Sequence, residues 1–339
     1  TRLPRAIRDV YKRQVMSRAW TPQSFFAGFP EPEGLHERTR QVEAFLHRHG
    51  ANGRKVVLVT SGGTTVPLEK NVVRFLDNFS AGTRGAASAE YFLKHGYAVI
   101  FMSRQHSQFP FTRSYSHTTN PLFDLLEEPG ANGGSVRVCE DQVGRLLPIL
   151  HAYHDAKKHG LLLTVPFVTV IEYLFLLRNI SLAMASIGRQ AMLYLAAAVS
   201  DFFMPEDRIS EHKIQSSDHA LTIELEQVPK VLGVLVQEWL PEAYIVSFKL
   251  ETDDNLLVPK SERSLRNYGH QLVIGNHLHR RKWEVVLVEQ TARMRTKTTD
   301  TTQPFEHTWI RLPPGSEREI EQDIVLALAQ RHIGWIGIA

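Results

Sequence analysis

Residues 55–64 read KVVLVTSGGT, a short β-branched run followed by a glycine-rich turn. The run predicts a buried strand from Lys55 to Thr60. Ligands of open α/β sheets bind at the carboxyl ends of strands, and glycine lets backbone amides approach a phosphate closely. Gly62 and Gly63 therefore make this turn a candidate anion site, although a tight turn without any ligand explains the same residues equally well.

The segments on either side of this strand place it in a parallel sheet. An amphipathic helix precedes it and stops at Gly50, a residue typical of helix ends. After the strand, a helix from Arg84 to His95 leads into a second β-branched run from Tyr97 to Met102. Strand, glycine turn, helix and strand form the βαβ pattern of a parallel sheet.

The remaining segments extend this pattern toward the carboxyl end of the chain. Apolar stripes and β-branched runs predict helices at 143–153, 170–182, 230–239 and 255–268, and strands at 192–198, 244–248 and 271–275. Residues 284–312 read as strand, Thr-rich turn and strand, and a final helix holds Ile320 to Leu328. We therefore predict an α/β fold with a Rossmann-like, doubly wound, mainly parallel sheet, helices on both faces and a small antiparallel extension.

The chain length of 339 residues fits one large α/β domain or two small ones. We find no internal repeat, and we predict that residues 16–339 form a single domain in which residues 104–141, rich in Ser, Thr, Pro, Gly and Asn, are surface loops. Residues 1–15 carry five basic side chains without the apolar region of a secretory signal, so we expect a disordered or non-native leader before Met16. A mitochondrial presequence is the less favoured alternative.

The composition argues against several classes of protein. Hydrophobic residues make up 43% and charged residues 22%, which is typical of soluble globular chains. The net charge is +3 with scattered basic residues, so we expect no nucleic-acid partner. The longest apolar runs, such as Met192–Val199, are shorter than the roughly 20 residues of a membrane span, so we expect no membrane partner. A single cysteine, Cys139, fits a reducing compartment and a cytoplasmic protein, and is expected to be an incidental thiol.

A second motif runs from Arg74 to Gly85, RFLDNFSAGTRG, directly into the predicted helix. Ser and Gly before a helix start can present free amide hydrogens and the positive end of the helix dipole to an anion. The motif matches neither the dinucleotide pattern G-x-G-x-x-G nor the Walker A pattern G-x-x-x-x-G-K-[ST]. The alternative is that Ser80 is the N-cap and that the glycines only permit close packing.

Three further segments place polar residues at strand ends or in loops. The stretch LAAAVSD ends a predicted strand at Asp201, and its small residues leave room either for a ligand or for a closely packed helix. The polar loop EHKIQSS contains Lys213, which either neutralises a phosphate or is simply solvated. Phe248 and Asn276 each stand at the end of a predicted strand.

Taken together, the stretches VVLVTSGGT, VRFLDNFSAGTRGA, YLAAAVSDF, EHKIQSS and SFKLET resemble the phosphopantothenoylcysteine synthetase family, the phosphopantothenate–cysteine ligases of coenzyme A biosynthesis. They occur in the family's order between Lys55 and Asn276. Bacterial relatives carry further lysines after the position of Lys213 and small residues in place of residues 248–252. Both departures favour the eukaryotic branch of the family, which uses ATP.

The resemblance implies a ligase that forms the amide bond between 4'-phosphopantothenate and L-cysteine. ATP would activate the carboxylate as an acyl-adenylate with loss of pyrophosphate, and the amine of cysteine would then release AMP. Mg²⁺ is implied as the ion that offsets phosphate charge, but no residue can be named as its ligand.

The resemblance also assigns roles to individual residues. Those that would frame the nucleotide are Gly62, Ser80, Gly82, Gly85, Phe248 and Asn276. Those that would hold phosphopantothenate are Arg74, Asn78, Ala197, Ala198 and Asp201. The resemblance implies a homodimer with shared active sites, in which Arg74 would reach the substrate of the neighbouring subunit. Asn78 would be the principal catalytic side chain, donating to the acyl oxygen, and Lys213 would close over the triphosphate as part of a flap.

Two other function classes remain as alternatives. A nicotinamide-dependent oxidoreductase on a Rossmann-like sheet is supported only by the glycine turns, and the missing dinucleotide pattern argues against it. A catalytically dead nucleotide-binding or scaffold protein is disfavoured because Arg74, Asn78, Asp201 and Lys213 are all present. His277 and His279 lack a third ligand, so we expect them to be solvated and not to hold a metal.

Overall fold

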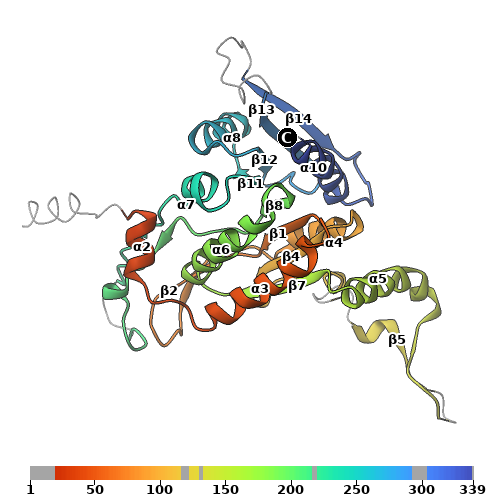
Figure 1. The fold of residues 1–339 in the computed structure, drawn as a ribbon. Coiled ribbons are helices and arrows are strands. Elements are labelled where there is room, and N and C mark those ends of the chain that lie inside the picture. The colour runs from red at the N-terminus through yellow and green to blue at the C-terminus, as the bar shows by residue number, and fades with distance from the viewer. Residues whose placement is uncertain (1–19, 116–121, 130–132, 216–219, 292–303, 338–339) are drawn as a thin grey trace, which may run out of the picture.

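An eight-stranded sheet with the order β14-β13-β12-β11-β8-β1-β4-β7 forms the centre of the computed structural model (Figure 1). The structure describes residues 20–115, 122–129, 133–215, 220–291 and 304–337. From β7 to β12 all neighbouring strands are parallel, whereas β13 and β14 pair antiparallel. The predicted fold class is therefore confirmed, including the antiparallel extension. The strands of this sheet are β1 (Val56–Ser61), β4 (Ala98–Arg104), β7 (Leu162–Phe167), β8 (Ala191–Leu195), β11 (Tyr244–Glu251), β12 (Leu272–His277), β13 (Glu284–Gln290) and β14 (Phe305–Arg311).

Helices cover both faces of the sheet (Figure 1). Helices α3 (Leu35–Gly50) and α6 (Val170–Met184) pack on one face, where α8 (Asp254–Tyr268) covers the strands toward the antiparallel edge. Helices α4 (Thr83–Lys94) and α10 (Ile320–Ile336) pack on the opposite face. Two smaller helices, α2 (Pro22–Gly28) and α7 (Val231–Val234), extend the face formed by α3 and α6.

Strand β1 shows why the sheet has two apolar faces. Its side chains alternate between the two cores, with Val56 and Leu58 facing α3 and α6, and Val57 and Val59 facing α4 and α10. All six residues of the strand are buried. A continuous run of β-branched residues is what a parallel strand needs when helices cover both of its faces.

Helix α6 passes a simple test for a membrane span. The segment Val170–Gln190, which includes the 3₁₀ turn η2 (Ala185–Gln190), is long and apolar enough by length and composition to cross a membrane. Tyr173, Leu174, Leu177 and other α6 side chains nevertheless lie in the core between α3 and the sheet. Core helices of soluble proteins meet the same criterion, so this is weak evidence for a membrane segment. The absence of a membrane partner stays a prediction.

Several small elements surround the sheet. Three two-stranded antiparallel pairs form, between β2 (Thr65–Pro67) and β3 (Phe75–Asp77), β5 (Leu126–Glu127) and β6 (Arg137–Val138), and β9 (Phe202–Phe203) and β10 (Glu226–Gln227). Helix α5 (Glu140–Lys158) and the β5–β6 pair extend away from the sheet in Figure 1. The 3₁₀ turns η1 (Leu122–Leu125) and η3 (Glu206–Arg208) and the π turn η4 (Leu235–Trp239) complete the described elements.

The structure also corrects some expected elements. Strand β7 was not predicted, because it contains Pro166, a residue tolerated in strands mainly at a sheet edge such as this one. Helix α2 was missed inside a Pro- and Gly-rich stretch. The strand expected over 192–198 ends at Leu195, and the helix expected over 230–239 consists of α7 and a π turn. The predicted leader, residues 1–15, lies outside the described residues.

Candidate active site

The order of strands in the sheet reverses at β1 and β8. The chain runs outward from β1 through β4 to β7, then returns to the other side of β1 as β8 before continuing to β11 and β12. Such a reversal of strand order is where open α/β sheets bind their ligands. The glycine turn after β1 and the small-residue loop after β8 both lie at this point.

Backbone hydrogen bonds join three of the predicted site segments into one unit. The N–H of Ala198 donates to the carbonyl of Gly62 at 2.8 Å, and the N–H of Thr64 donates back to the carbonyl of Ala198 at 3.0 Å. The N–H of Asn78 donates to the carbonyl of Thr64 at 3.1 Å. A Cβ at Gly63 would lie 1.6 Å from the carbonyl oxygen of Asn78, so only glycine permits this approach. The structure thus brings Gly62, Asn78 and Ala198 together.

Two buried threonine hydroxyls, which the sequence reasoning did not single out, hold the loop after β8. The N–H of Ala197 donates to Oγ1 of Thr60 at 3.1 Å. The N–H of Ser200 donates to Oγ1 of Thr64 at 2.9 Å. Both threonines have no exposed surface. The available signal was their place in and beside the TSGGT turn, where a buried hydroxyl can bind a neighbouring amide.

The N-terminus of α4 lies against the end of β1. Gly82 is its N-cap with φ of 81°, and the hydroxyl of Ser61 donates to the Gly82 carbonyl at 3.0 Å. A Cβ on Gly85 would lie 2.4 Å from Oγ of Ser61, so the helix can approach this closely only with glycine there. The alternative that Ser80 is the N-cap is wrong, because Gly82 takes that position in the left-handed conformation. No side chain caps this helix, so its first N–H groups remain available to an anion.

Arg84 links α4 to the end of β12 and to α10. Its guanidinium donates to Oδ1 of Asn276 at 3.3 Å and forms an ion pair with Glu321 at 2.9 Å. Burial raises the pKa of Glu321, and the charge of Arg84 opposes that rise. The ring of Phe248 packs edge-on against Tyr194, with centroids 4.9 Å apart. Asn276 is thus held by a side chain of α4, and Phe248 packs on Tyr194, whose hydroxyl lies 2.8 Å from Oγ of Ser88 in α4.

Arg74 is bound within its own subunit to a buried carboxylate. Its guanidinium donates to Oε1 of Glu69 at 3.0 Å and to the carbonyl of Ile214 at 2.9 Å. Burial alone would raise the pKa of Glu69. The hydrogen bonds from the backbone N–H groups of Arg74 and Ile214 and from the Arg74 guanidinium outweigh this effect, so the pKa of Glu69 lies below its ordinary value. Lys213, which precedes Ile214, is exposed. Among the described contacts, none links Lys213 to the Gly62 turn.

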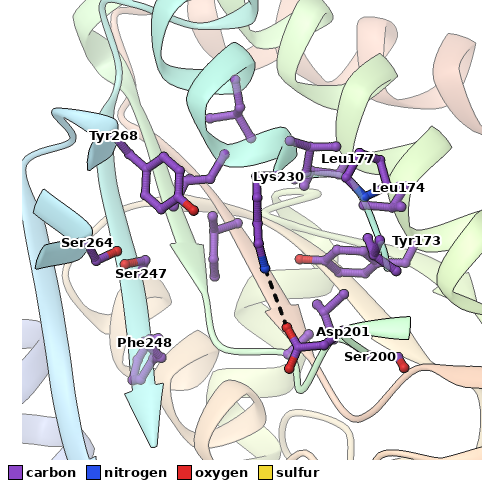
Figure 2. A pocket seen from close by; sticks show the side chains of 18 of the residues that line it. Tyr173, Leu174, Leu177, Ser200, Asp201, Lys230, Ser247, Phe248, Ser264 and Tyr268 are labelled. Atoms are coloured by element: carbon purple, nitrogen blue, oxygen red, sulfur yellow. Dashed lines mark ion pairs between the residues drawn. The ribbon is translucent and has the colours of Figure 1, made fainter. Parts of the chain in front are cut away.

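Asp201 lies at the mouth of a cavity of about 280 Å³ (Figure 2). Its carboxylate pairs with Nζ of Lys230 at 3.8 Å, and both side chains are largely exposed. Figure 2 shows the hydroxyl of Tyr173 pointing into the same space, with Phe248 on the opposite wall. Burial raises the pKa of Tyr173 to about 12, so the phenol stays protonated at neutral pH. Aliphatic side chains of α6 and α7 also line the cavity.

Potential metal ligands are sparse around this site. Within the parts of the chain that the structure describes, no three His, Cys, Asp or Glu side chains gather so as to hold a metal ion. Nε2 of His277 lies 2.9 Å from the carbonyl of Thr252, so that histidine has a partner in the protein.

Comparison with known proteins gives the family of the chain. The family model for the DNA/pantothenate metabolism flavoprotein C-terminal domain matches residues 52–116 and 178–308. The human phosphopantothenate–cysteine ligase is 42% identical over 92% of this chain and 97% of its own length. The chain belongs to the phosphopantothenate–cysteine ligase family. Its relatives in rice (ligase 2) and Saccharomyces cerevisiae (Cab2) are 41% and 38% identical over 91% and 99% of the chain.

Solved structures agree with this assignment. A variant of Cab2 in complex with phosphopantothenate-cysteine has a TM-score of 0.82 at 39% identity, covering 93% of this chain and 98% of that one. A DNA/pantothenate metabolism flavoprotein from Streptococcus pneumoniae, at 17% identity and a TM-score of 0.52, shares the fold. Membership of a ligase family decides against the nicotinamide-dependent oxidoreductase and confirms the family that the motifs indicate.

Proposed function

We propose that this family member joins phosphopantothenate to L-cysteine through an acyl-adenylate formed from ATP. The observation that carries the proposal is the hydrogen-bonded unit of Gly62, Ala198 and Asn78 at the strand reversal. The hydrogen bonds fix the backbone of Gly62, predicted to contact the nucleotide, relative to Ala198, predicted to contact the substrate, and to the predicted catalytic residue Asn78. Curated relatives of similar length carry the name phosphopantothenate–cysteine ligase, which supports the same substrates here.

The nucleotide would bind at the N-terminus of α4. The uncapped amides after Gly82 and the positive end of the helix dipole would bind the phosphates. The close approach of Gly85 to Ser61 places these amides beside the end of β1. Arg84 and Asn276 would then border the nucleotide on the β12 side, and Phe248 would contact it beside Tyr194. Mg²⁺ would arrive with the nucleotide, offsetting phosphate charge during departure of the pyrophosphate.

The proposed chemistry has two steps at one carboxyl group, the first at its oxygen and the second at its carbon. In the first, a carboxylate oxygen of phosphopantothenate attacks the α-phosphorus of ATP, and the bond to pyrophosphate breaks. In the second, the cysteine amine attacks the acyl carbon, a proton leaves the nitrogen, and AMP departs with the bonding electrons. The side-chain amide of Asn78 donates to the acyl oxygen as negative charge develops there. Lys213 would approach the triphosphate when its loop closes.

A homodimer would complete the site. The β2–β3 hairpin carries Arg74 and exposes apolar side chains beside it; the exposed fractions are 93% for Phe79 and 54% for both Val72 and Val73. A cluster of this kind favours burial against another protein surface. In the proposed dimer, Arg74 would contact the phosphate of the substrate held by Ala198 and Asp201 of the partner.

Release of pyrophosphate tests the proposed reaction directly. Purified protein should release pyrophosphate from ATP only when phosphopantothenate is present, and should form AMP and phosphopantothenoylcysteine when cysteine is added. Release of inorganic phosphate and ADP in place of pyrophosphate and AMP would contradict the acyl-adenylate route. Parallel assays with CTP would measure the preference between nucleotides.

A further inference from the structure

Thr64 makes three hydrogen bonds that join its own turn to two other functional segments, the end of the β2–β3 hairpin and the loop after β8. Its carbonyl accepts from the N–H of Asn78, its N–H donates to the carbonyl of Ala198, and its hydroxyl accepts from the N–H of Ser200 at 2.9 Å. The side chain is fully buried. Any residue could make the two backbone bonds, but only a hydroxyl at this position makes the third.

The bond to Ser200 bears on the orientation of Asp201. The Ser200 hydroxyl is turned the other way, donating to the carbonyl of Phe202 at 2.8 Å. The carbonyl of Asp201 accepts from the N–H of Val228 at 2.9 Å. The Thr64 hydroxyl therefore anchors the amino-terminal side of the Asp201 turn, while Val228 anchors the turn itself.

We propose that the hydroxyl of Thr64 is a positioning group that sets the Asp201 turn relative to Asn78. This inference rests on the proposed function, in which Asp201 holds phosphopantothenate and Asn78 acts on its acyl group. Without the hydroxyl, the Ser200 N–H loses its acceptor and the turn has to shift to find another. The substrate carboxylate would then sit away from the Asn78 amide, and misplacement by about 1 Å can cost about 10²-fold in rate.

The neighbouring Thr65 provides a matched control. It is also buried, and its hydroxyl donates to the carbonyl of Val168 at 3.0 Å, in the connection between β7 and α6. That carbonyl also accepts from the backbone N–H of Thr65, so removing the hydroxyl leaves it with a partner. Thr65→Val and Thr64→Val each delete one buried hydroxyl from the same segment, but only the second touches the Asp201 turn.

Steady-state kinetics of Thr64→Val, Thr64→Ser and Thr65→Val test the proposal. Thr64→Val should lower kcat/KM for phosphopantothenate by about 10-fold to 100-fold, with the KM for ATP close to that of the unmodified protein. Thr64→Ser retains the hydroxyl and should restore most of the activity. Thr65→Val should remain near full activity, and thermal unfolding of all three variants shows whether they fold.

Three results would overturn the positioning role. These are an equal loss in Thr64→Val and Thr65→Val, a Thr64→Ser variant as poor as Thr64→Val, or a KM for ATP that rises as much as that for phosphopantothenate. If Thr64→Val does not fold, Thr64→Cys replaces it, because Cys and Ser differ only in the acceptor atom and sulfur accepts weakly. An unmodified protein that releases no pyrophosphate would instead refute the proposed function, and the positioning role with it.

Discussion

At the scale of single residues, the site depends on glycines, which have no side chain. Gly63 and Gly85 allow contacts with Asn78 and Ser61 that any Cβ would block. Gly82 adopts a left-handed conformation at the start of α4. The backbone amides can therefore lie within reach of a phosphate, which larger residues would prevent.

Replacing Gly85 by alanine tests the approach of α4 to β1. The new Cβ would lie 2.5 Å from Cβ of Ser61, so the start of the helix has to move. We expect ATP affinity, measured by calorimetry, to fall at least about 10-fold, which corresponds to about 1.4 kcal/mol. Gly144→Ala in α5 is the control: nothing lies near its Cβ, and it should be neutral or stabilising by about 0.5–1 kcal/mol. Unchanged ATP affinity in Gly85→Ala would remove α4 from the nucleotide site.

Replacing Asn78 by aspartate tests the amide donor. The side-chain N–H₂ donor is replaced by an oxygen of a negatively charged carboxylate, whereas the backbone bond from Asn78 to Thr64 does not depend on the side chain. Turnover in the pyrophosphate and AMP assay should fall by about 10²–10³-fold, the usual effect of losing one such donor. Circular dichroism and thermal unfolding should match the unmodified protein. Near-normal turnover in a folded variant would refute the catalytic role.

The sequence allowed some of these residues to be predicted and not others. Gly62, Asn78 and Ala198 belong to motifs that resemble a family, and the structure holds them together. Thr60 and Thr64 were missed because the hydrogen-bond partner of a hydroxyl depends on which side of the turn it faces. The amino-acid sequence does not give that direction. The burial of Glu69 could not be predicted from the sequence either, because carboxylates are ordinarily exposed.

At the scale of elements, the loop that carries Lys213 is attached to the hairpin that carries Arg74. The carbonyls of Ser210 and Glu211 accept from the N–H groups of Lys70 and Asn71, and the N–H of Ile214 donates to Glu69 at 3.3 Å. Lys213 itself projects into solvent between these anchors. The backbone is therefore held on both sides of Lys213, and the exposed side chain of the lysine is the part left free to reach a ligand.

Replacing Lys213 by glutamine should impair adenylate formation while thermal stability barely changes. The side chain is exposed, and exposed substitutions typically change stability by less than about 0.5 kcal/mol. Single-turnover pyrophosphate release isolates the first step. Lys70→Gln is the control, since it removes another exposed lysine from the same region. A strongly destabilised Lys213→Gln variant would mark this lysine as structural.

Helices and strands could be predicted from the sequence where their apolar residues form a clear run or stripe. The strands β1, β4, β11 and β12 each begin with at least three consecutive apolar residues, and the helices α4 and α8 follow clear apolar stripes. The β2–β3 hairpin was not predicted because three residues on each side are too few to show alternation. Its pairing depends on contacts with the Gly63 turn, which are not local in the sequence.

At the scale of the whole molecule, a dimer with shared sites makes a sharp prediction. In this structure Arg74 is bound to Glu69 with its side chain 41% exposed, so part of the guanidinium faces outward. Mixing Arg74→Ala subunits with Asn78→Asp subunits should restore about a quarter of full activity, because about half of the dimers are mixed and each has one intact site. Subunit exchange verified by mass spectrometry, with no recovery of activity, would show that Arg74 serves its own subunit.

Two buried histidines predict how global stability depends on pH. Burial lowers the pKa of His270 and of His332 to about 4. Both are therefore neutral in the folded protein, whereas the unfolded chain takes up their protons near pH 6.5. Between these values the unfolded state binds more protons, so the free energy of unfolding falls as pH falls.

The expected loss between pH 7 and pH 5 is about 2 kcal/mol for each histidine. Denaturant titrations at several pH values measure it. His49 is a third buried histidine whose pKa burial lowers, so in His332→Gln the decline should shrink by about 2 kcal/mol and not vanish, even if the variant is less stable at pH 7. His47→Gln, at an exposed position on α3, is the control and should keep the full slope. An unchanged slope in His332→Gln would show that His332 is not the source.

The central place of β1 in the sheet affects how the chain folds while the ribosome synthesises it. Val56 pairs on one side with Ala98 and on the other with Ala191, so this strand waits for more than half of the chain before both neighbours exist. The glycine turn is in the same position, since its partner Ala198 follows β8. On the ribosome, the amino-terminal segment therefore emerges with an apolar strand edge uncovered. Chaperones that shield such edges would matter most during the interval before β8 is translated.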